Sequence, residues 1–167
     1  MPSLIPRDEV IRRIREEGGD PPCLMCAVAA RRVGDLHVVF EDDEALVFLP
    51  RYVRRWGELC VMPKTHVTSF VALEADTWLH WQTLVRRSTR VVERLMQPRR
   101  CYVAMTGSAA GELTQSSEHL HTHILPISDA SDRPSKALSW EEGVLVATRE
   151  EWLTLRAQYV AAFDAER

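Results

Sequence analysis

The sequence predicts an α+β fold in which one long helix packs on an antiparallel sheet of five strands. Short apolar runs of strand type are separated by turns and loops, which is typical of a meander. One segment, residues 73–98, instead repeats its apolar residues at the spacing of a helix. A length of 167 residues suits one core, so we expect residues 1–167 to form a single domain.

The first elements are a short helix and two strands. Residues 6–19 (PRDEVIRRIREEGG) predict a helix, because Val10, Ile11 and Ile14 share one face and two glycines end the segment. Residues 36–41 and 45–50 predict strands on either side of the acidic turn EDDE. A third strand at 59–63 follows a loop with three arginines. The three arginines are Arg51, Arg54 and Arg55. They could steer a polyphosphate into the site, or the loop could simply be solvated.

The remaining elements are two helices and two strands. The helix within 73–98 has Pro98 just beyond its end. Residues 101–106 and 119–127 predict the fourth and fifth strands, with a loop of small residues between them. A terminal helix over 149–165 follows Thr148, a candidate cap with Glu151 three residues later. Four apolar positions give this helix one face that packs on the domain or on a partner subunit: Trp152, Leu155, Tyr159 and Phe163.

Composition excludes several classes of protein. The formal net charge of -3 gives no electrostatic argument for binding nucleic acid. The sequence has no apolar run of about 18 residues, so we expect no membrane span. The N-terminus becomes charged too early for a secretory signal peptide, and a cytoplasmic location is therefore expected.

The cysteines divide into two kinds. Cys60 and Cys101 lie in apolar runs, where we expect buried, inert thiols. Cys23 and Cys26 form a CxxC pair, which in a reducing compartment indicates a metal or redox chemistry. No thioredoxin-like pattern surrounds the pair. Two reduced, half-buried thiols without a metal remain the alternative.

Three of the six histidines alternate within five residues: His119, His121 and His123. On one strand they point to one face, with neighbours ~6.6 Å apart, which is too far for direct contact between imidazoles. All three could nevertheless reach one polyanionic ligand or its metal. The alternatives are a metal site made of all three, or an ordinary solvent-facing strand. We expect only structural roles for the separate residues His37 and His80.

The stretch His-Leu-His-Thr-His-Ile-Leu, residues 119–125, resembles the signature of the histidine triad (HIT) family, His-φ-His-φ-His-φ-φ with φ apolar. Thr122 is the one polar residue at a φ position. The CxxC pair and the segment MPKTH, residues 62–66, agree with this resemblance in order and spacing. It covers residues 23–127 and implies a HIT-like fold, with residues 128–167 as an extension.

The resemblance also implies roles for individual residues. His121 would attack the α-phosphate of a nucleotide, giving a nucleotidyl-histidine that water resolves. His123 and Ser116 would contact phosphate, with Gln115 beside them. Relatives that bind zinc imply a structural site, and relatives that pair through the long helix and an edge strand imply a homodimer. The zinc ligands would be Cys23, Cys26, His66 and His119.

Some positions depart from the family pattern. Pro50 and Arg51 stand where several members carry an asparagine or aspartate near the ribose, and Glu58 stands where a histidine often lies. Thr106 and Ser108 could substitute for the asparagine that usually begins the loop before the motif.

The expected function is hydrolysis or transfer of a nucleoside monophosphate. The substrate would be a dinucleoside polyphosphate, a nucleoside phosphoramidate or an adenylated small molecule. The alternatives are a nucleotide-binding regulatory module with negligible turnover and a zinc-dependent structural protein.

Overall fold

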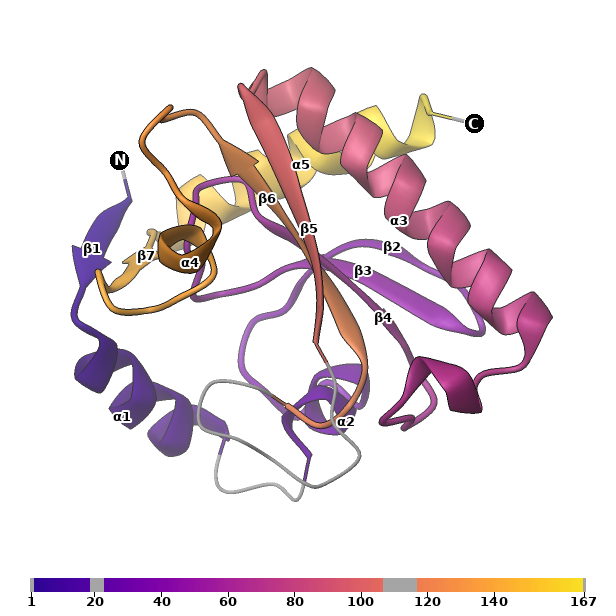
Figure 1. The fold of residues 1–167 in the computed structure, drawn as a ribbon. Coiled ribbons are helices and arrows are strands. Elements are labelled where there is room, and N and C mark those ends of the chain that lie inside the picture. The colour runs from indigo at the N-terminus through magenta and orange to yellow at the C-terminus, as the bar shows by residue number, and fades with distance from the viewer. Residues whose placement is uncertain (1, 19–22, 107–116, 167) are drawn as a thin grey trace.

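A computed structural model describes residues 2–18, 23–106 and 117–166. Its centre is a five-stranded antiparallel sheet in the order β2-β3-β4-β6-β5 (Figure 1). The α+β class and the five strands that the sequence predicts are therefore confirmed. The strands of this sheet are β2 (His37–Glu41), β3 (Ala45–Leu49), β4 (Leu59–Pro63), β5 (Arg100–Thr106) and β6 (His121–Ile127).

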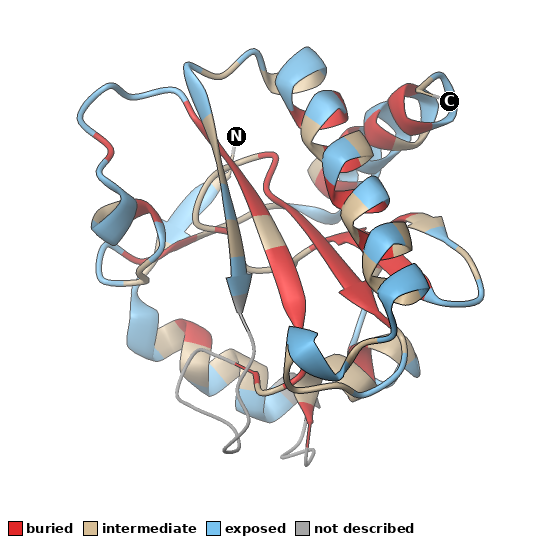
Figure 2. Cartoon of the chain, turned by 45° about the vertical axis from the view of Figure 1, so that its right-hand side comes forward, coloured by how far each residue is buried: buried red, intermediate tan, exposed pale blue. Residues whose placement is uncertain are grey.

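Two helices cover one face of the sheet, α3 (Ala75–Met96) and α5 (Arg149–Asp164). The periodicity of α3 buries Trp81 and Leu84 against the sheet, and the helix ends where Gln97 adopts a left-handed conformation. In α5 the predicted capping box of Thr148 and Glu151 is present. The four apolar residues predicted for its inner face are all buried within this chain. Figure 2 shows both buried and exposed residues along the helix that ends near C.

The opposite face carries the short helix α2 (Leu24–Ala29). Ala27 and Val28 of α2 pack on Leu46, Phe48 and other β3 and β4 residues of the same face. The sequence did not indicate this helix, because six residues are too few to show a helical period. Cys23 caps it by accepting a hydrogen bond from the backbone N–H of Cys26, at 3.4 Å.

A second, two-stranded sheet pairs β1 (Ser3–Ile5), near the N-terminus, with β7 (Val144–Val146), which precedes α5. The predicted N-terminal helix α1 (Arg7–Gly18) follows β1 directly. A single bridge between Val53 and Leu145 joins this small sheet to the loop after β3. The remaining short elements are η1 (Phe70–Ala72) and α4 (Pro134–Ala137). None of the described helices is long and apolar enough to cross a membrane.

One strand boundary differs from the prediction in a way that affects the histidines. Strand β6 begins at His121, not at residue 119. The backbone N–H of Leu120 donates to the carbonyl of Val67 at 2.8 Å, so the chain here is tied to the loop after β4 rather than to a neighbouring strand. His119 therefore lies in a bend just before the strand.

Candidate active site and metal site

Four side chains far apart in the sequence meet between α2 and the start of β6: Cys23, Cys26, His66 and His119. Their donor atoms all lie within 4.8 Å of one another. The Cys26 sulfur lies 3.2 Å from Nδ1 of His66 and 3.5 Å from Nδ1 of His119, and the Cys23 sulfur lies 3.7 Å from the latter atom. A tetrahedral ion with the bond lengths of zinc would separate sulfur and nitrogen donors by about 3.5 Å. The four residues therefore form a candidate metal site.

The outer nitrogens of both histidines are also engaged. Nε2 of His119 donates to the carbonyl of Pro63 at 2.9 Å, which leaves Nδ1 as the atom that faces the sulfurs. Nε2 of His66 lies 3.4 Å from a carboxylate oxygen of Glu118. Partners of this kind fix the tautomer and orientation of metal-binding histidines. This arrangement supports a metal at Nδ1 of each ring.

The imidazole of His121 is held in one tautomer by its own strand. Its Nδ1–H donates to the backbone carbonyl of His119 at 2.7 Å, so the lone pair lies on Nε2. The residue as a whole is buried, with 3% of its surface exposed. Burial, with a smaller effect of His123, lowers the pKa of His121 to about 3. The ring is therefore neutral at pH 7, as a nucleophile must be.

His121 and His123 lie on the same face of β6, toward α2. His123 pairs with Cys60 of β4 and, like that residue, faces away from α3 and α5. The ring centroids of the two histidines are 4.9 Å apart in an edge-to-face arrangement. The expectation that the side chains are too far apart for contact was therefore wrong, because the rings tilt toward one another.

His123 also contacts a buried acid, Glu58, which directly precedes β4. Nδ1 of His123 lies 2.8 Å from Oε1 of Glu58, within ion-pair distance but without the angle of a hydrogen bond. The same oxygen lies 2.8 Å from Nη1 of Arg54. Burial alone would raise the pKa of Glu58, but the charge of Arg54 and the contact with His123 hold it below its ordinary value. An acid, an arginine and the third histidine thus form one linked group.

A cavity of about 280 Å³, here called the histidine pocket, opens at these residues. Its polar lining residues include Ser117, Arg54 and the histidines His121 and His123. Its apolar lining comes from α1, α2, the segment before β2, and β3: Ile11, Ile14, Leu24, Met25, Val28, Val33, Leu36 and Phe48. The pocket therefore combines polar groups that suit an anion with a large apolar surface.

The HIT-domain family model matches residues 31–130, more than half of this chain. The chain belongs to the HIT family. The matched segment contains all three triad histidines, Glu58 and the loop after β3, whereas α1, α2 and α5 lie outside it.

Two curated proteins are similar to this HIT protein. An uncharacterised HIT-like protein of Methanocaldococcus jannaschii is 29% identical over 104 residues, which cover 62% of this chain and 78% of that protein. An uncharacterised HIT-like protein of Saccharolobus solfataricus is 25% identical over 105 residues, which cover 62% of this chain and 73% of that protein.

Solved structures share the fold. A hypothetical histidine triad nucleotide-binding protein of Sulfolobus tokodaii matches with a TM-score of 0.67 and 21% identity, over 86% of this chain and 93% of that one. A zinc-bound histidine triad family protein of Mycobacterium smegmatis matches with a TM-score of 0.64 and 21% identity, over 87% of this chain and 97% of that one.

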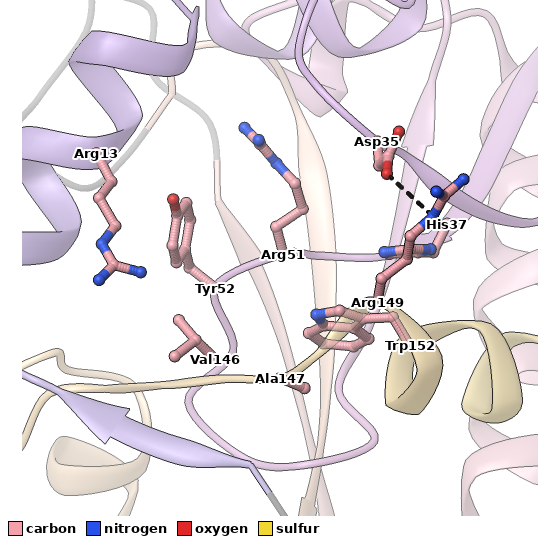
Figure 3. Close-up of a pocket in the computed structure, with 9 residues that line it drawn as sticks. All are labelled: Arg13, Asp35, His37, Arg51, Tyr52, Val146, Ala147, Arg149 and Trp152. Atoms are coloured by element: carbon pink, nitrogen blue, oxygen red, sulfur yellow. Dashed lines mark ion pairs between the residues drawn. The ribbon is translucent and has the colours of Figure 1, made fainter.

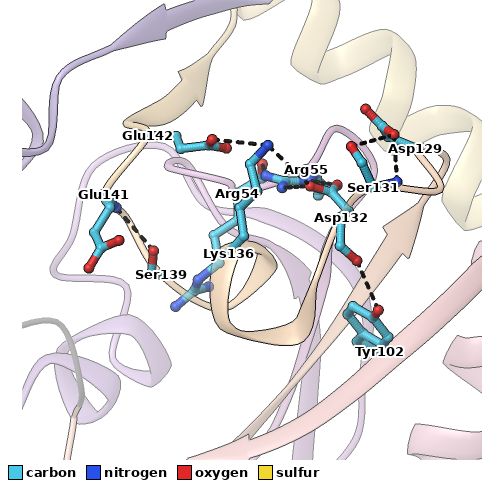
Figure 4. Close-up of polar contacts among 10 residues, drawn as sticks. All are labelled: Arg54, Arg55, Tyr102, Asp129, Ser131, Asp132, Lys136, Ser139, Glu141 and Glu142. Carbon is cyan, nitrogen blue, oxygen red and sulfur yellow. Dashed lines mark hydrogen bonds and ion pairs between the residues drawn. The ribbon is translucent and has the colours of Figure 1, made fainter.

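The C-terminal extension of this HIT protein helps to build the histidine pocket. Trp140 lines the pocket, and the guanidinium of Arg54 lies 5.8 Å from the centroid of the Trp140 ring. Arg55 holds the extension in place by donating two hydrogen bonds of 2.6 Å to the carboxylate of Asp132 (Figure 4). The hydroxyl of Tyr102 donates to the backbone carbonyl of the same residue at 3.0 Å. Arg54 and Arg55 therefore contact the C-terminal extension, and the interpretation of these two arginines as solvated was wrong.

The other predicted site residues fall at the edge of the described chain. Thr106 is the last residue of β5 and its backbone pairs with His121, but its side chain is outside the described part. Ser108, Gln115 and Ser116 also lie outside the described residues. Cys60 is buried and Cys101 is half-buried; burial raises the pKa of both thiols, that of Cys101 to about 11.

Sequence reasoning named Arg54 only as a loop residue that could steer a polyphosphate and Glu58 only as a departure from the family pattern, and it gave no role to Trp140. Arg54 and Trp140 line the histidine pocket, and Glu58 contacts His123. One signal was present, because Arg54 and Glu58 are opposite charges four residues apart and Glu58 directly precedes an apolar strand. No local pattern marks Trp140, since its position depends on how the extension folds back.

Proposed function

We propose that this HIT protein is a nucleotide hydrolase or nucleotidyl transferase that acts at the α-phosphate through His121. The observation that supports it best is the hydrogen bond from His121 Nδ1 to the carbonyl of His119, 2.7 Å long. It leaves the lone pair on Nε2 of a neutral ring that lines the histidine pocket. A nucleophile needs this combination of tautomer, charge and access.

The proposed reaction has two displacements at phosphorus. Nε2 of His121 attacks the α-phosphorus, a P–N bond forms, and the bond from phosphorus to the leaving group breaks. The leaving group departs with that electron pair and takes up a proton. Water, or another acceptor in a transferase, then attacks the same phosphorus and releases a proton to solvent. The P–N bond breaks, its electron pair returns to Nε2, and the neutral imidazole is restored.

Arg54 would supply positive charge to the phosphoryl oxygens and His123 a ring nitrogen that can hydrogen-bond them, since both line the histidine pocket. A proton donor to the leaving group contributes ~10²–10⁴ to the rate, and His123 is a candidate for part of that role. The apolar lining residues would hold the base. Dinucleoside polyphosphates, nucleoside phosphoramidates and adenylated small molecules all present the required α-phosphate.

We infer that the four-residue metal site holds zinc, because two thiolates and two imidazoles are a preferred ligand set for that ion. Four protein ligands fill a tetrahedral site, so the ion would be structural. It would tie α2 to His119, the residue whose carbonyl orients His121. The zinc-bound relative from Mycobacterium smegmatis is consistent with this assignment.

We also propose a homodimer through β5 and α3. Strand β5 is an edge of the sheet, and it exposes Val103 and Met105, while α3 exposes Leu79. Pairing two such edges would remove both from solvent. Light scattering should give twice the chain mass for the wild type and a lower mass for Val103→Lys; a wild-type monomer would refute the proposal.

Trapping the covalent intermediate tests the catalytic proposal. The wild type is mixed with a labelled adenylated substrate and quenched in base, because a phosphohistidine bond is labile in acid. The label should remain on His121. His121→Asn should bind nucleotide but lose turnover, and His123→Ala should slow turnover with little effect on stability. Turnover by His121→Asn within a few-fold of the wild type would overturn the proposal. Binding without turnover by the wild type would favour the regulatory module.

A further inference from the structure

A second cavity, of about 310 Å³, adjoins the histidine pocket. Figure 3 shows the residues that line it. Its walls come from α1, the residues around the start of β2, the segment after β3 and the start of α5. We call it the arginine pocket. Its basic and aromatic lining residues are Arg13, His37, Arg51, Tyr52, Arg149 and Trp152.

The arginine pocket is strongly cationic. Three guanidinium groups line it against one carboxylate, that of Asp35, which leaves two positive charges in excess (3 − 1 = 2). Arg149 and Asp35 are 3.8 Å apart, and their side chains are 79% and 74% exposed, so this pair is weak. Arg13 pairs with Glu9, which is not among the lining residues. A guanidinium carries five N–H donors, so an ion pair does not exhaust its capacity for an anion.

One wall of the arginine pocket is a rigid aromatic stack. The rings of His37 and Trp152 are 5.3 Å apart and nearly parallel, at 19°. Both side chains are buried, and burial lowers the pKa of His37, so its ring is neutral at pH 7 and adds no charge. The charge of the pocket therefore comes from the arginines, which stand around a fixed surface.

Arg51 and Tyr52 line both pockets, so the two cavities adjoin. In Figure 3 the Arg51 side chain stands between Tyr52 on one side and the His37–Trp152 stack on the other. Its guanidinium packs on the backbone of Gly34: a Cβ at that glycine would lie 2.5 Å from Nη1 of Arg51. A molecule in the histidine pocket that extends past Arg51 and Tyr52 would therefore reach the arginine pocket.

We propose that the arginine pocket binds a second phosphate group of the nucleotide whose α-phosphate lies at His121. This inference rests on the proposed function and names its substrate class: a nucleotide with a second anionic group at a distance from the reacting phosphorus. Guanidinium groups bind phosphate through paired, charge-assisted hydrogen bonds. The second phosphate could be carried by the sugar, at its 2′ or 3′ position, or by the polyphosphate chain of the leaving group.

Calorimetric titration in the His121→Asn background tests the proposal without consuming the ligand. The ligands are AMP, adenosine 2′,5′- and 3′,5′-bisphosphate, and diadenosine tetraphosphate. The site variant adds Arg13→Ala and Arg149→Ala, two residues that do not line the histidine pocket. The control variant adds Arg12→Ala, an exposed arginine on α1 that lines neither pocket.

At least one of the longer ligands should bind about 10-fold more tightly than AMP, and its identity separates a sugar phosphate from a polyphosphate chain. The preference for the longer ligand over AMP should fall to about 2-fold or less in the site variant and persist in the control variant. In the protein with an intact arginine pocket it should also weaken as the salt concentration rises. AMP binding should be the same in all three proteins. Equal affinity for all ligands, or a preference that survives the site variant, would overturn this inference alone. If neither AMP nor any longer ligand binds, both this inference and the proposed function fail.

Discussion

Nδ1 of His123 lies 2.8 Å from Oε1 of Glu58, a carboxylate with no exposed surface. A buried carboxylate needs compensating charge, and here Arg54 provides it. We propose that Glu58 orients His123 and so acts as a positioning residue for the proposed reaction.

Replacing this carboxylate should affect both stability and turnover. Glu58→Gln keeps the shape but leaves the Arg54 charge without its buried partner, which should cost about 3 kcal/mol of unfolding free energy. Since the group beside His123 loses its negative charge and holds the ring less firmly, kcat should fall by about 10-fold or more with a smaller change in KM. Chemical denaturation and steady-state kinetics check this. The exposed Glu150→Gln is the matched control, and an unchanged kcat in folded Glu58→Gln would contradict the positioning role.

The buried carboxylate of Glu58 should also make the free energy of unfolding depend on pH in the acidic range. Glu58 has a lower pKa in the folded chain than its ordinary value of 4.5, so its charge stabilises the fold above that pH. The stabilisation is lost as the pH falls below 4.5 toward the folded value. The difference in unfolding free energy between wild type and Glu58→Gln should therefore shrink on acidification. A difference that stays constant from pH 7 to pH 3 would rule this linkage out.

The metal ligands should control both zinc content and folding. Cys23→Ala and His66→Ala should each reduce bound zinc well below one per chain and lower the melting temperature, because metal-binding energy contributes to folding energy. Elemental analysis and thermal melts measure this. Cys101→Ala and His80→Ala, which lie outside the four-residue site, should keep the metal. Full zinc in both ligand variants would refute the assignment.

The C-terminal helix should be coupled to the loop that carries Glu58. The hydroxyl of Tyr159 in α5 donates to the carbonyl of Gly57 at 2.6 Å, and both groups are buried. Tyr159→Phe leaves that carbonyl unsatisfied, at a cost of about 1–3 kcal/mol. Its melting temperature should fall more than that of Tyr102→Phe, which loses a 3.0 Å, partly exposed hydrogen bond. Equal shifts would argue against a special role for this contact.

Thr122, the polar residue within the triad motif, should be replaceable with a gain in stability. Its side chain is 1% exposed, and its hydroxyl finds no partner in the described part of the chain. Thr122→Val keeps the shape and removes an unsatisfied group, so it should stabilise by about 1 kcal/mol. Turnover should not change, because residue 122 faces away from His121. A destabilised variant would show that the hydroxyl has a partner.

The sequence by itself determined the parts of this protein that repeat locally. The period of α3, the strand-like runs, the capping box at Thr148 and the triad motif are all patterns of neighbouring residues. The resemblance to a family then grouped Cys23 with His66 and His119, although they lie far apart in the chain.

Tertiary structure alone decided what depends on contacts between distant segments that have no local pattern. The pairing of β1 with β7, the start of β6 at His121 and the approach of Trp140 to Arg54 belong to this class. So does the arginine pocket, where Arg13 and Arg149 from opposite ends of the chain face one cavity. The physical reason is that a short strand or a surface arginine has no preferred partner until the sheet and helices fix the surfaces on which it packs.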